Sequence, residues 1–359
     1  MKMNLILHPG HPKCGSSSIQ KFLYDNRATL EAKGYALPDR FFHFGFEKNS
    51  DFSIALPPVQ FFARIYGQGD YAALENRIVN VIASARTSDV HTIILSAENV
   101  SGFPTGPIHA LFSKYFNVQR VLYYIRKQDD FMLSAWQQWG HKTGRGIVEF
   151  CDEQVAGGFP DYLENAEMLK SHYGNDILDV APFSRKVFHN GDLIFDFLVR
   201  TGLDSIIQPQ GVEIIENKSL NPLTCEYLAK FPDIYRNKHD NLPKINMEKY
   251  KHTEPWLFES RKDYLTQMQR KTILDRFDAG NRKLHAEYFP SISYDLLFGF
   301  SDTGQRGDED HLPSPLEKQQ IVFLQNWVQK WLRFNKFRTF YTLNMDLLHK
   351  MKSYFSRSR

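Results

Sequence analysis

The chain has 359 residues, and its 42% hydrophobic and 24% charged content is ordinary for a globular protein with one elaborated domain or a domain with an appendage. Its net charge of +3 gives no sign of a nucleic-acid partner. Three scattered cysteines indicate neither a disulfide framework nor a zinc cluster, and the short apolar run at the amino terminus indicates neither a secretory signal nor a membrane anchor. These features predict a cytoplasmic protein with no metal.

Strand-like and helical segments alternate along the first half of the chain. Short apolar runs predict buried strands at Asn4–His8, His91–Ala97, Val118–Ile125 and Ile177–Pro182. Helical patterns lie at Ser17–Lys33, Tyr71–Ala85, Asp129–Lys142 and Tyr162–His172. The alternation predicts an α/β fold of three layers, with a P-loop-type parallel sheet flanked by helices and a helical C-terminal appendage.

The first strand leads into a glycine-rich turn and a helix that begins with three serines, Ser16–Ser18. The first amides of a helix lack partners within it, and together with the helix dipole they attract an anion. Gly15 lets the backbone approach such a ligand closely, and Lys13 adds a positive charge. The segment therefore predicts a phosphate cradle; the alternative is a capped helix beside a chance lysine.

The lysine of this loop is misplaced for an ordinary nucleotide triphosphatase. Gly10 and Gly15 have the spacing of a Walker glycine pair, but Ser16 follows the second glycine and the only lysine precedes it. This position favours a different anionic ligand.

Two further strand ends carry polar residues. Glu98 follows the strand at His91–Ala97, and Arg126 follows the strand at Val118–Ile125. Ligands of parallel sheets bind beyond the carboxyl ends of the strands, so we expect both to lie near Pro9–Ser18. Arg126 and Ser134, two turns into the next helix, have the chemistry to hold a second phosphate. Glu98 also suits a capping or ion-paired role.

Two aromatic regions are candidates for the substrate side of a site. Residues 35–69 form an aromatic loop region, which we interpret as a substrate-side insertion, a lid or a packing element. A second group either lines a sugar groove or packs in the core, and consists of Trp136, Trp139, His141, Lys142 and Arg145.

The C-terminal part differs in composition from the rest. Ser301–Pro315, rich in Gly, Asp, Ser and Pro, predicts a linker after a domain at 1–300. Residues 316–359 form an aromatic tail, in which Lys318–Arg359 contains nine Lys and Arg against a single acid, Asp346. A tail of this composition suits one of three roles. It contacts the anionic inner face of a membrane, it packs on the rest of the protein, or it binds an acidic glycan.

Taken together, the motifs resemble those of sulfotransferases that use 3′-phosphoadenosine 5′-phosphosulfate, especially the bacterial and carbohydrate-acting branches. The first motif is matched by His8, Gly10, Lys13, Gly15, Ser16, Ser17, Ser18, Ile19 and Gln20, and the second by Tyr124, Arg126 and Ser134. Weaker matches are Asn217, Ser219 and Leu220, and the segment Asn281–Pro290. The sequence departs from the family at Cys14 and at Lys127–Gln128, and the likeness ends before Ser301.

The resemblance implies transfer of a sulfuryl group from 3′-phosphoadenosine 5′-phosphosulfate to a hydroxyl of a carbohydrate or lipid-linked saccharide. It implies that the 5′-phosphosulfate rests on the backbone of Cys14–Ser18, and that Lys13 stabilises the departing phosphate. Arg126 and Ser134, with Asn217 and Ser219, would hold the rest of the donor. Glu98 resembles the catalytic base of glycosaminoglycan sulfotransferases, and His43 is the alternative base.

Two other functions compete with the transferase. A P-loop kinase or other nucleotide phosphotransferase needs a lysine after Gly15, which is absent. A non-catalytic protein that interacts through its basic tail would not need Lys13, Glu98, Arg126 and Ser134 together.

Overall fold

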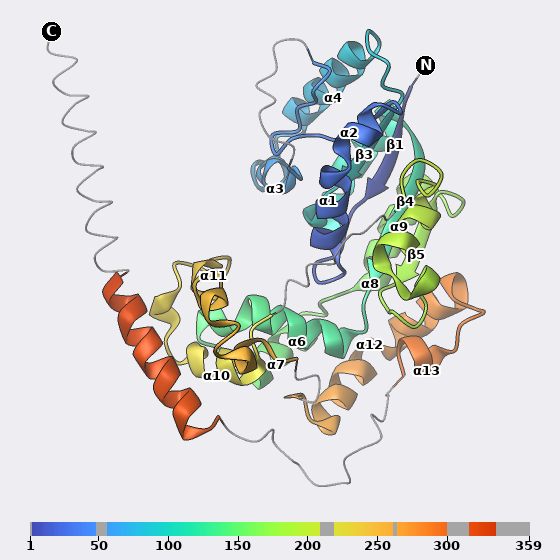
Figure 1. The fold of residues 1–359 in the computed structure, drawn as a ribbon. Helices are drawn as coiled ribbons and strands as arrows, with labels where there is room; N and C mark the ends of the chain where they lie inside the picture. The colour runs from blue at the N-terminus through green and yellow to red at the C-terminus, as the bar shows by residue number, and fades with distance from the viewer. Residues whose placement is uncertain (1, 48–55, 209–218, 261–263, 300–315, 335–359) are drawn as a thin grey trace, which may run out of the picture. The chain divides into compact units, whose positions relative to one another are not determined.

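The computed structural model describes residues 2–47, 56–208, 219–260, 264–299 and 316–334, and Figure 1 shows its ribbon. The chain forms two compact units, each assembled from separate segments. The sheet unit consists of Met1–Phe131, Gly158–Glu216 and Thr272–Ser301. The helical unit consists of Met132–Gly157, Asn217–Lys271 and Asp302–Arg359. The predicted linker at 301–315 lies outside the described residues, and the predicted domain limits stay a prediction.

The sheet unit is an α/β fold with an all-parallel sheet of five strands, flanked by helices. The strand order is β2-β3-β1-β4-β5. The bounds of the strands are β1 Met3–His8, β2 Tyr35–Ala36, β3 Thr92–Ser96, β4 Phe116–Ile125 and β5 Leu178–Pro182. The predicted parallel α/β fold is confirmed. The two-residue strand β2 at the edge of the sheet was not predicted, because so short a run has no detectable period.

Alternate residues of the central strands supply two separate cores. On β1, Leu5 and Leu7 belong to one buried cluster and Ile6 belongs to the other. Successive side chains of a strand point to opposite faces, so both faces of the sheet are covered. Helices α1 (Ser16–Asp25) and α9 (Leu193–Thr201) pack on the face of Ile6. The other face is covered by α3 (Val59–Gln68), α4 (Tyr71–Ala85), α5 (Gly106–Tyr115) and α8 (Tyr162–Tyr173). The predicted three layers follow from this arrangement.

The helices of the sheet unit are α1 Ser16–Asp25, α2 Arg27–Glu31, α3 Val59–Gln68, α4 Tyr71–Ala85, α5 Gly106–Tyr115, α8 Tyr162–Tyr173, α9 Leu193–Thr201 and α13 Tyr294–Leu297, with the short 3₁₀ turns η1 Glu98–Val100, η2 Phe103–Thr105 and η4 His189–Gly191. Helices α6 Gln128–Gln138 and α12 Gln267–Tyr288 contain the boundaries between the units. The predicted helix at Ser17–Lys33 is two helices, α1 and α2. They separate at Asn26, whose side chain donates to the carbonyl of Phe22 at 2.9 Å.

The helical unit contains α7 Ile147–Ala156, α10 Pro222–Ala229, α11 Leu242–Met247, the turns η3 Gly140–Thr143, η5 Pro232–Ile234, η6 Glu248–Tyr250 and η7 Pro255–Phe258, and a helix at 318–334. The last helix is the described part of the basic tail, and its tryptophans are buried. Trp327 donates to Asn246 and Trp331 to the carbonyl of Ile234, both at 3.0 Å. These rings therefore pack within the unit. Residues 335–359 lie outside the described part, and membrane contact by the tail stays a prediction.

None of the described helices is both long enough and apolar enough to cross a membrane.

Candidate functional site

The loop between β1 and α1 has three residues in the left-handed backbone region. These are Gly10 (φ 55°), Lys13 (φ 65°) and Gly15 (φ 76°). A non-glycine residue there is uncommon, and such residues gather at functional sites. Gly15 is also required by space, because a Cβ atom at this position would lie 2.4 Å from Leu193 Cδ2. The loop is therefore held in a specific shape by its glycines and by the side chains beneath it.

Three backbone amides at the start of α1 are available to an anion. The amide of Cys14 donates to the carbonyl of His11 at 3.2 Å, and that of Ser18 donates to Gly15 at 3.0 Å. Gly15 precedes the helix and provides no side-chain cap. Within the described residues, the amides of Gly15–Ser17 have no hydrogen-bond partner. The free amides thus cover Gly15–Ser17, a shorter segment than the predicted Cys14–Ser18, and Ser16 is its central residue.

Glu98 is tied to the start of this helix. The hydroxyl of Ser16 donates a hydrogen bond to Glu98 Oε1, across 82 residues of sequence. Glu98 begins η1, directly after β3, and a Cβ on Gly10 would lie 3.4 Å from its Cα. The carboxylate therefore lies against the cradle with part of its surface accessible.

Arg126 reaches the same loop from the end of β4. Its Nη1 donates to the carbonyl of Lys13 at 3.1 Å, and its guanidinium lies 5.7 Å from the centre of the Phe183 ring. Lys13, Ser16, Glu98 and Arg126 thus meet at one edge of the sheet, as predicted for the ends of parallel strands. Their chemical roles stay predictions.

The loop histidines are structural. Burial lowers the pKa of His8 to about 3 and that of His11 to about 4, the latter against a hydrogen bond to the carbonyl of Pro12. His8 Nδ1 shares a hydrogen bond of 2.8 Å with the Ser96 hydroxyl. His8 Nε2 is buried without a partner among the described residues. Both rings are therefore neutral at physiological pH, and they pack in the interior at the loop.

The Cys14 side chain is fully buried in the core beside α1 and α9. Burial is the largest influence on its thiol and raises the pKa to about 12, although the charges of Arg126 and Lys13 oppose this. The thiol is therefore unreactive, and the loop uses Cys14 for packing.

Other predicted site residues form none of these contacts in the part of the chain that the structure describes. Ser134 on α6 and Ser219 before α10 belong to the helical unit, whereas the cradle contacts involve the sheet unit alone. Asn217 lies outside the described residues. His43 contacts Asp39 and Phe41 in the loop that follows β2.

The predicted sugar-groove group is mostly core. Trp136, His141 and Lys142 are buried, and Trp136 donates to the carbonyl of Arg145 at 2.9 Å. His141 shares a hydrogen bond of 3.0 Å with the Tyr235 hydroxyl. Packing, the second of the two alternatives, therefore accounts for Trp136, His141 and Lys142.

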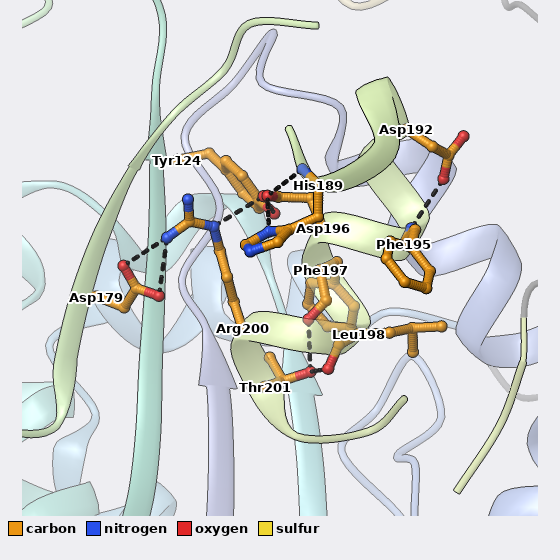
Figure 2. Close-up of polar contacts among 10 residues, drawn as sticks. All are labelled: Tyr124, Asp179, His189, Asp192, Phe195, Asp196, Phe197, Leu198, Arg200 and Thr201. Atoms are coloured by element: carbon orange, nitrogen blue, oxygen red, sulfur yellow. Dashed lines mark hydrogen bonds and ion pairs between the residues drawn. The ribbon is translucent and has the colours of Figure 1, made fainter. Parts of the chain in front are cut away.

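An ionic network beside the loop was not predicted from the sequence (Figure 2). The buried carboxylate of Asp196 on α9 accepts from the Tyr124 hydroxyl at 2.6 Å, the His189 amide at 3.0 Å and Arg200 Nε at 2.9 Å. Arg200 also pairs with Asp179 on β5 at 3.0 Å. The network joins α9 to β4 and β5, and α9 contributes the Leu193 side chain that packs under Gly15. The only sequence signal is the four-residue spacing of Asp196 and Arg200.

Replacing Asp196 by asparagine is expected to destabilise the protein by about 3 kcal/mol, because a buried charge pair loses one partner. Burial, the largest influence, favours the neutral acid, but the hydrogen bonds from Tyr124 and His189 and the charge of Arg200 leave the pKa of Asp196 below its ordinary value. The network therefore stabilises the fold fully above the ordinary carboxyl pKa of about 4 and loses this effect as the pH falls below it.

Urea unfolding at pH 7 and pH 3 measures this effect. The difference between wild type and Asp196→Asn should shrink at the lower pH. Asp192→Asn is the control, since asparagine also caps a helix and should cost less than about 0.5 kcal/mol. An equal loss of stability at both pH values would show that the charge of Asp196 contributes nothing.

Within the described residues, no group of three His, Cys, Asp or Glu side chains is arranged to hold a metal ion. No family model matches the chain. No solved structure matches it either. Among curated proteins it is similar to an uncharacterized protein of Archaeoglobus fulgidus, with 24% identity over 234 residues. The match covers 63% of this chain and 60% of the relative, so the chain spans less than two thirds of the relative's length. The function must therefore be argued from the residues of the site.

Proposed function

We propose that this protein transfers a sulfuryl group from 3′-phosphoadenosine 5′-phosphosulfate to a hydroxyl of a carbohydrate or glycolipid acceptor. The supporting observation is that a carboxylate, Glu98, is hydrogen-bonded to the first residue of a helix whose free amides form an anion cradle. A cradle binds a leaving group, and a carboxylate beside it accepts a proton from a nucleophile. The two together suit group transfer better than simple anion binding.

The charges of the loop fit a phosphosulfate. The three amides of Gly15–Ser17 are free, and they lie on the same loop as Lys13. The second cation, Arg126, donates a hydrogen bond to the Lys13 carbonyl. The donor carries a phosphosulfate at one end and a separate phosphate on its ribose. Lys13 suits the first group, and Arg126 suits the second. The family resemblance also implies donor contacts by Ser134, Asn217 and Ser219, and these contacts stay a prediction.

The proposed reaction is an in-line displacement at sulfur. The acceptor oxygen forms a bond to sulfur while the bond from sulfur to the bridging phosphate oxygen breaks, and the product is adenosine 3′,5′-bisphosphate. The proton of the acceptor hydroxyl passes to Glu98. Lys13 and the amides of Gly15–Ser17 stabilise the negative charge that develops on the leaving phosphate. His43 is the second candidate for the base.

Adenosine 3′,5′-bisphosphate is expected to stabilise the protein against heat. A ligand at 100 times its dissociation constant adds about 2.7 kcal/mol, which corresponds to a rise of several degrees in the melting temperature. ATP with magnesium should give a much smaller rise, because it has no 3′-phosphate. Thermal-shift measurements with both ligands separate the transferase from a kinase. Stabilisation by ATP with magnesium alone would overturn the proposal, and stabilisation by neither would favour a non-catalytic protein.

A further inference from the structure

The loop after β2 is held in a strained shape by buried contacts. Phe42, at φ 64°, adopts the left-handed backbone region, which bulky residues rarely occupy. Its carbonyl accepts two hydrogen bonds from Arg77, at 3.0 Å and 2.7 Å, and Arg77 also pairs with Glu47. The buried carboxylate of Asp39 accepts from the amides of Phe41 and His43, both at 2.8 Å. The surroundings therefore determine the shape of this loop.

This shape buries Phe42 and leaves the two preceding side chains, Arg40 and Phe41, exposed. Phe42 is 1% exposed and stacks on Phe61 of α3 with the ring centres 5.4 Å apart. Phe41, in contrast, is 48% exposed. The Arg40 guanidinium lies over the Phe41 ring, 4.7 Å from its centre. The centre of the His43 ring lies 6.1 Å from the centre of the Phe41 ring. The fixed loop thus displays one guanidinium, one aromatic ring and one imidazole, which we name the Arg40 platform (Arg40, Phe41 and His43).

The Arg40 platform and Glu98 lie on neighbouring loops of one sheet edge. Strands β2 and β3 are paired in parallel, so the chain leaves both at the same edge. The platform follows β2 and Glu98 follows β3. Asn99, next to Glu98, donates a hydrogen bond to the carbonyl of Val59 at the start of α3. The helix that packs under Phe42 is therefore also bonded to the turn that carries the proposed base.

The charge of the platform indicates the class of its ligand. Among the described residues, the Arg40 guanidinium contacts the Phe41 ring and forms no ion pair. An exposed aromatic ring stacks on the apolar face of a sugar, and a guanidinium binds a carboxylate in a bidentate manner. A neutral sugar would use the ring alone, and a simple anion would use the guanidinium alone. An acidic sugar uses both.

We propose that the Arg40 platform binds a carboxylate-bearing saccharide and that this sugar is part of the acceptor. The inference rests on the proposed function, because it names the acceptor class of that reaction. The sugar ring packs on Phe41, its carboxylate pairs with Arg40, and His43 extends the contact surface. Because the backbone of this loop is already fixed, binding of the sugar does not lose conformational entropy by ordering it.

Direct binding by the full chain tests the platform without any transfer reaction. The probes are oligosaccharides of hyaluronan, alginate and polysialic acid, each compared with its carboxyl-reduced form by calorimetry in low salt. At least one acidic probe should bind at least about tenfold more tightly than its reduced form. Arg40→Ala and Phe41→Ala should each weaken that binding by about tenfold, and Arg40→Lys should restore part of it. Arg86→Ala, which removes an exposed arginine at the end of α4, should leave it unchanged.

The outcomes separate this inference from the proposed function. Binding of an acidic probe that depends on Arg40 and Phe41, without sulfate transfer to it, would support the platform and count against the transferase. Sulfate transfer that is unaffected by Arg40→Ala and Phe41→Ala would overturn the platform and leave the transferase intact. Absence of binding to every acidic probe, or equal binding of the reduced forms, would also overturn the platform.

Discussion

Replacing Lys13 by alanine is expected to lower the rate of sulfuryl transfer by about 10³-fold, equal to about 4 kcal/mol of transition-state stabilisation. The reason is that the leaving phosphate gains negative charge beside the loop, where the Lys13 ammonium is one of two nearby cations. Arg126 is the other, and it already donates to the Lys13 carbonyl. The measurement is the rate of transfer of labelled sulfate from the donor, under single-turnover conditions.

A second substitution separates the charge of Lys13 from its backbone shape. Lys13 has a φ of 65°, so alanine there is strained whereas glycine is not. Lys13→Gly should therefore be more stable than Lys13→Ala by about 1 kcal/mol but equally inactive. Lys21→Ala on α1 removes an exposed cation and should keep full activity. If Lys13→Gly were active, the lysine would serve the loop's shape and not the reaction.

Glu98→Gln is expected to lower turnover by about 10² to 10⁴-fold, the usual contribution of a general base. Glutamine has nearly the same shape and still offers an oxygen to the Ser16 hydroxyl, so the cradle should remain intact. Binding of adenosine 3′,5′-bisphosphate should therefore be unchanged. Labelled-sulfate transfer and thermal shift on the same preparation measure both properties.

Ser16→Ala is the matched control for Glu98→Gln. Alanine removes the hydroxyl that donates to Glu98 but keeps the backbone amide in the cradle and the carboxylate at the strand end. Its turnover should fall by about tenfold, the effect of losing one hydrogen bond of about 1.4 kcal/mol that orients the base. If Glu98 only holds the loop, Glu98→Gln, which keeps this hydrogen bond, would lose no more activity than Ser16→Ala. Full activity of Glu98→Gln would move the base elsewhere, with His43 the next residue to test.

The fold was predictable where the local pattern was long and regular. The helix at Tyr71–Ala85 has the bounds predicted for it, because its apolar residues repeat at helical spacing and Asp70 caps its start. The break at Asn26 was missed, because the hydrophobic face continues from Phe22 to Leu30 across it. The two units were also not evident, since the segments of each are far apart in sequence.

The site was predictable only in part, for a similar reason. That Lys13, Glu98 and Arg126 would gather at one edge followed from the parallel sheet alone. That Ser16 would bond to Glu98, and that Arg126 would reach the Lys13 carbonyl, did not follow, because hydrogen-bond partners depend on side-chain conformations across 82 and 113 residues of sequence. The Asp196 network was missed because its members come from β4, β5 and α9.

For this protein the sequence by itself determined the alternation of four buried strands with helices and the unusual position of the lysine in the first loop. These are local properties, set by hydrophobic period, glycine and the start of a helix. Only the tertiary structure decided which amides of the loop are free, that Glu98 lies against them, and that Phe41 is exposed while Phe42 is buried. Each of these depends on contacts between residues brought together by the packing of the sheet and its helices, and a pattern along the chain does not encode them.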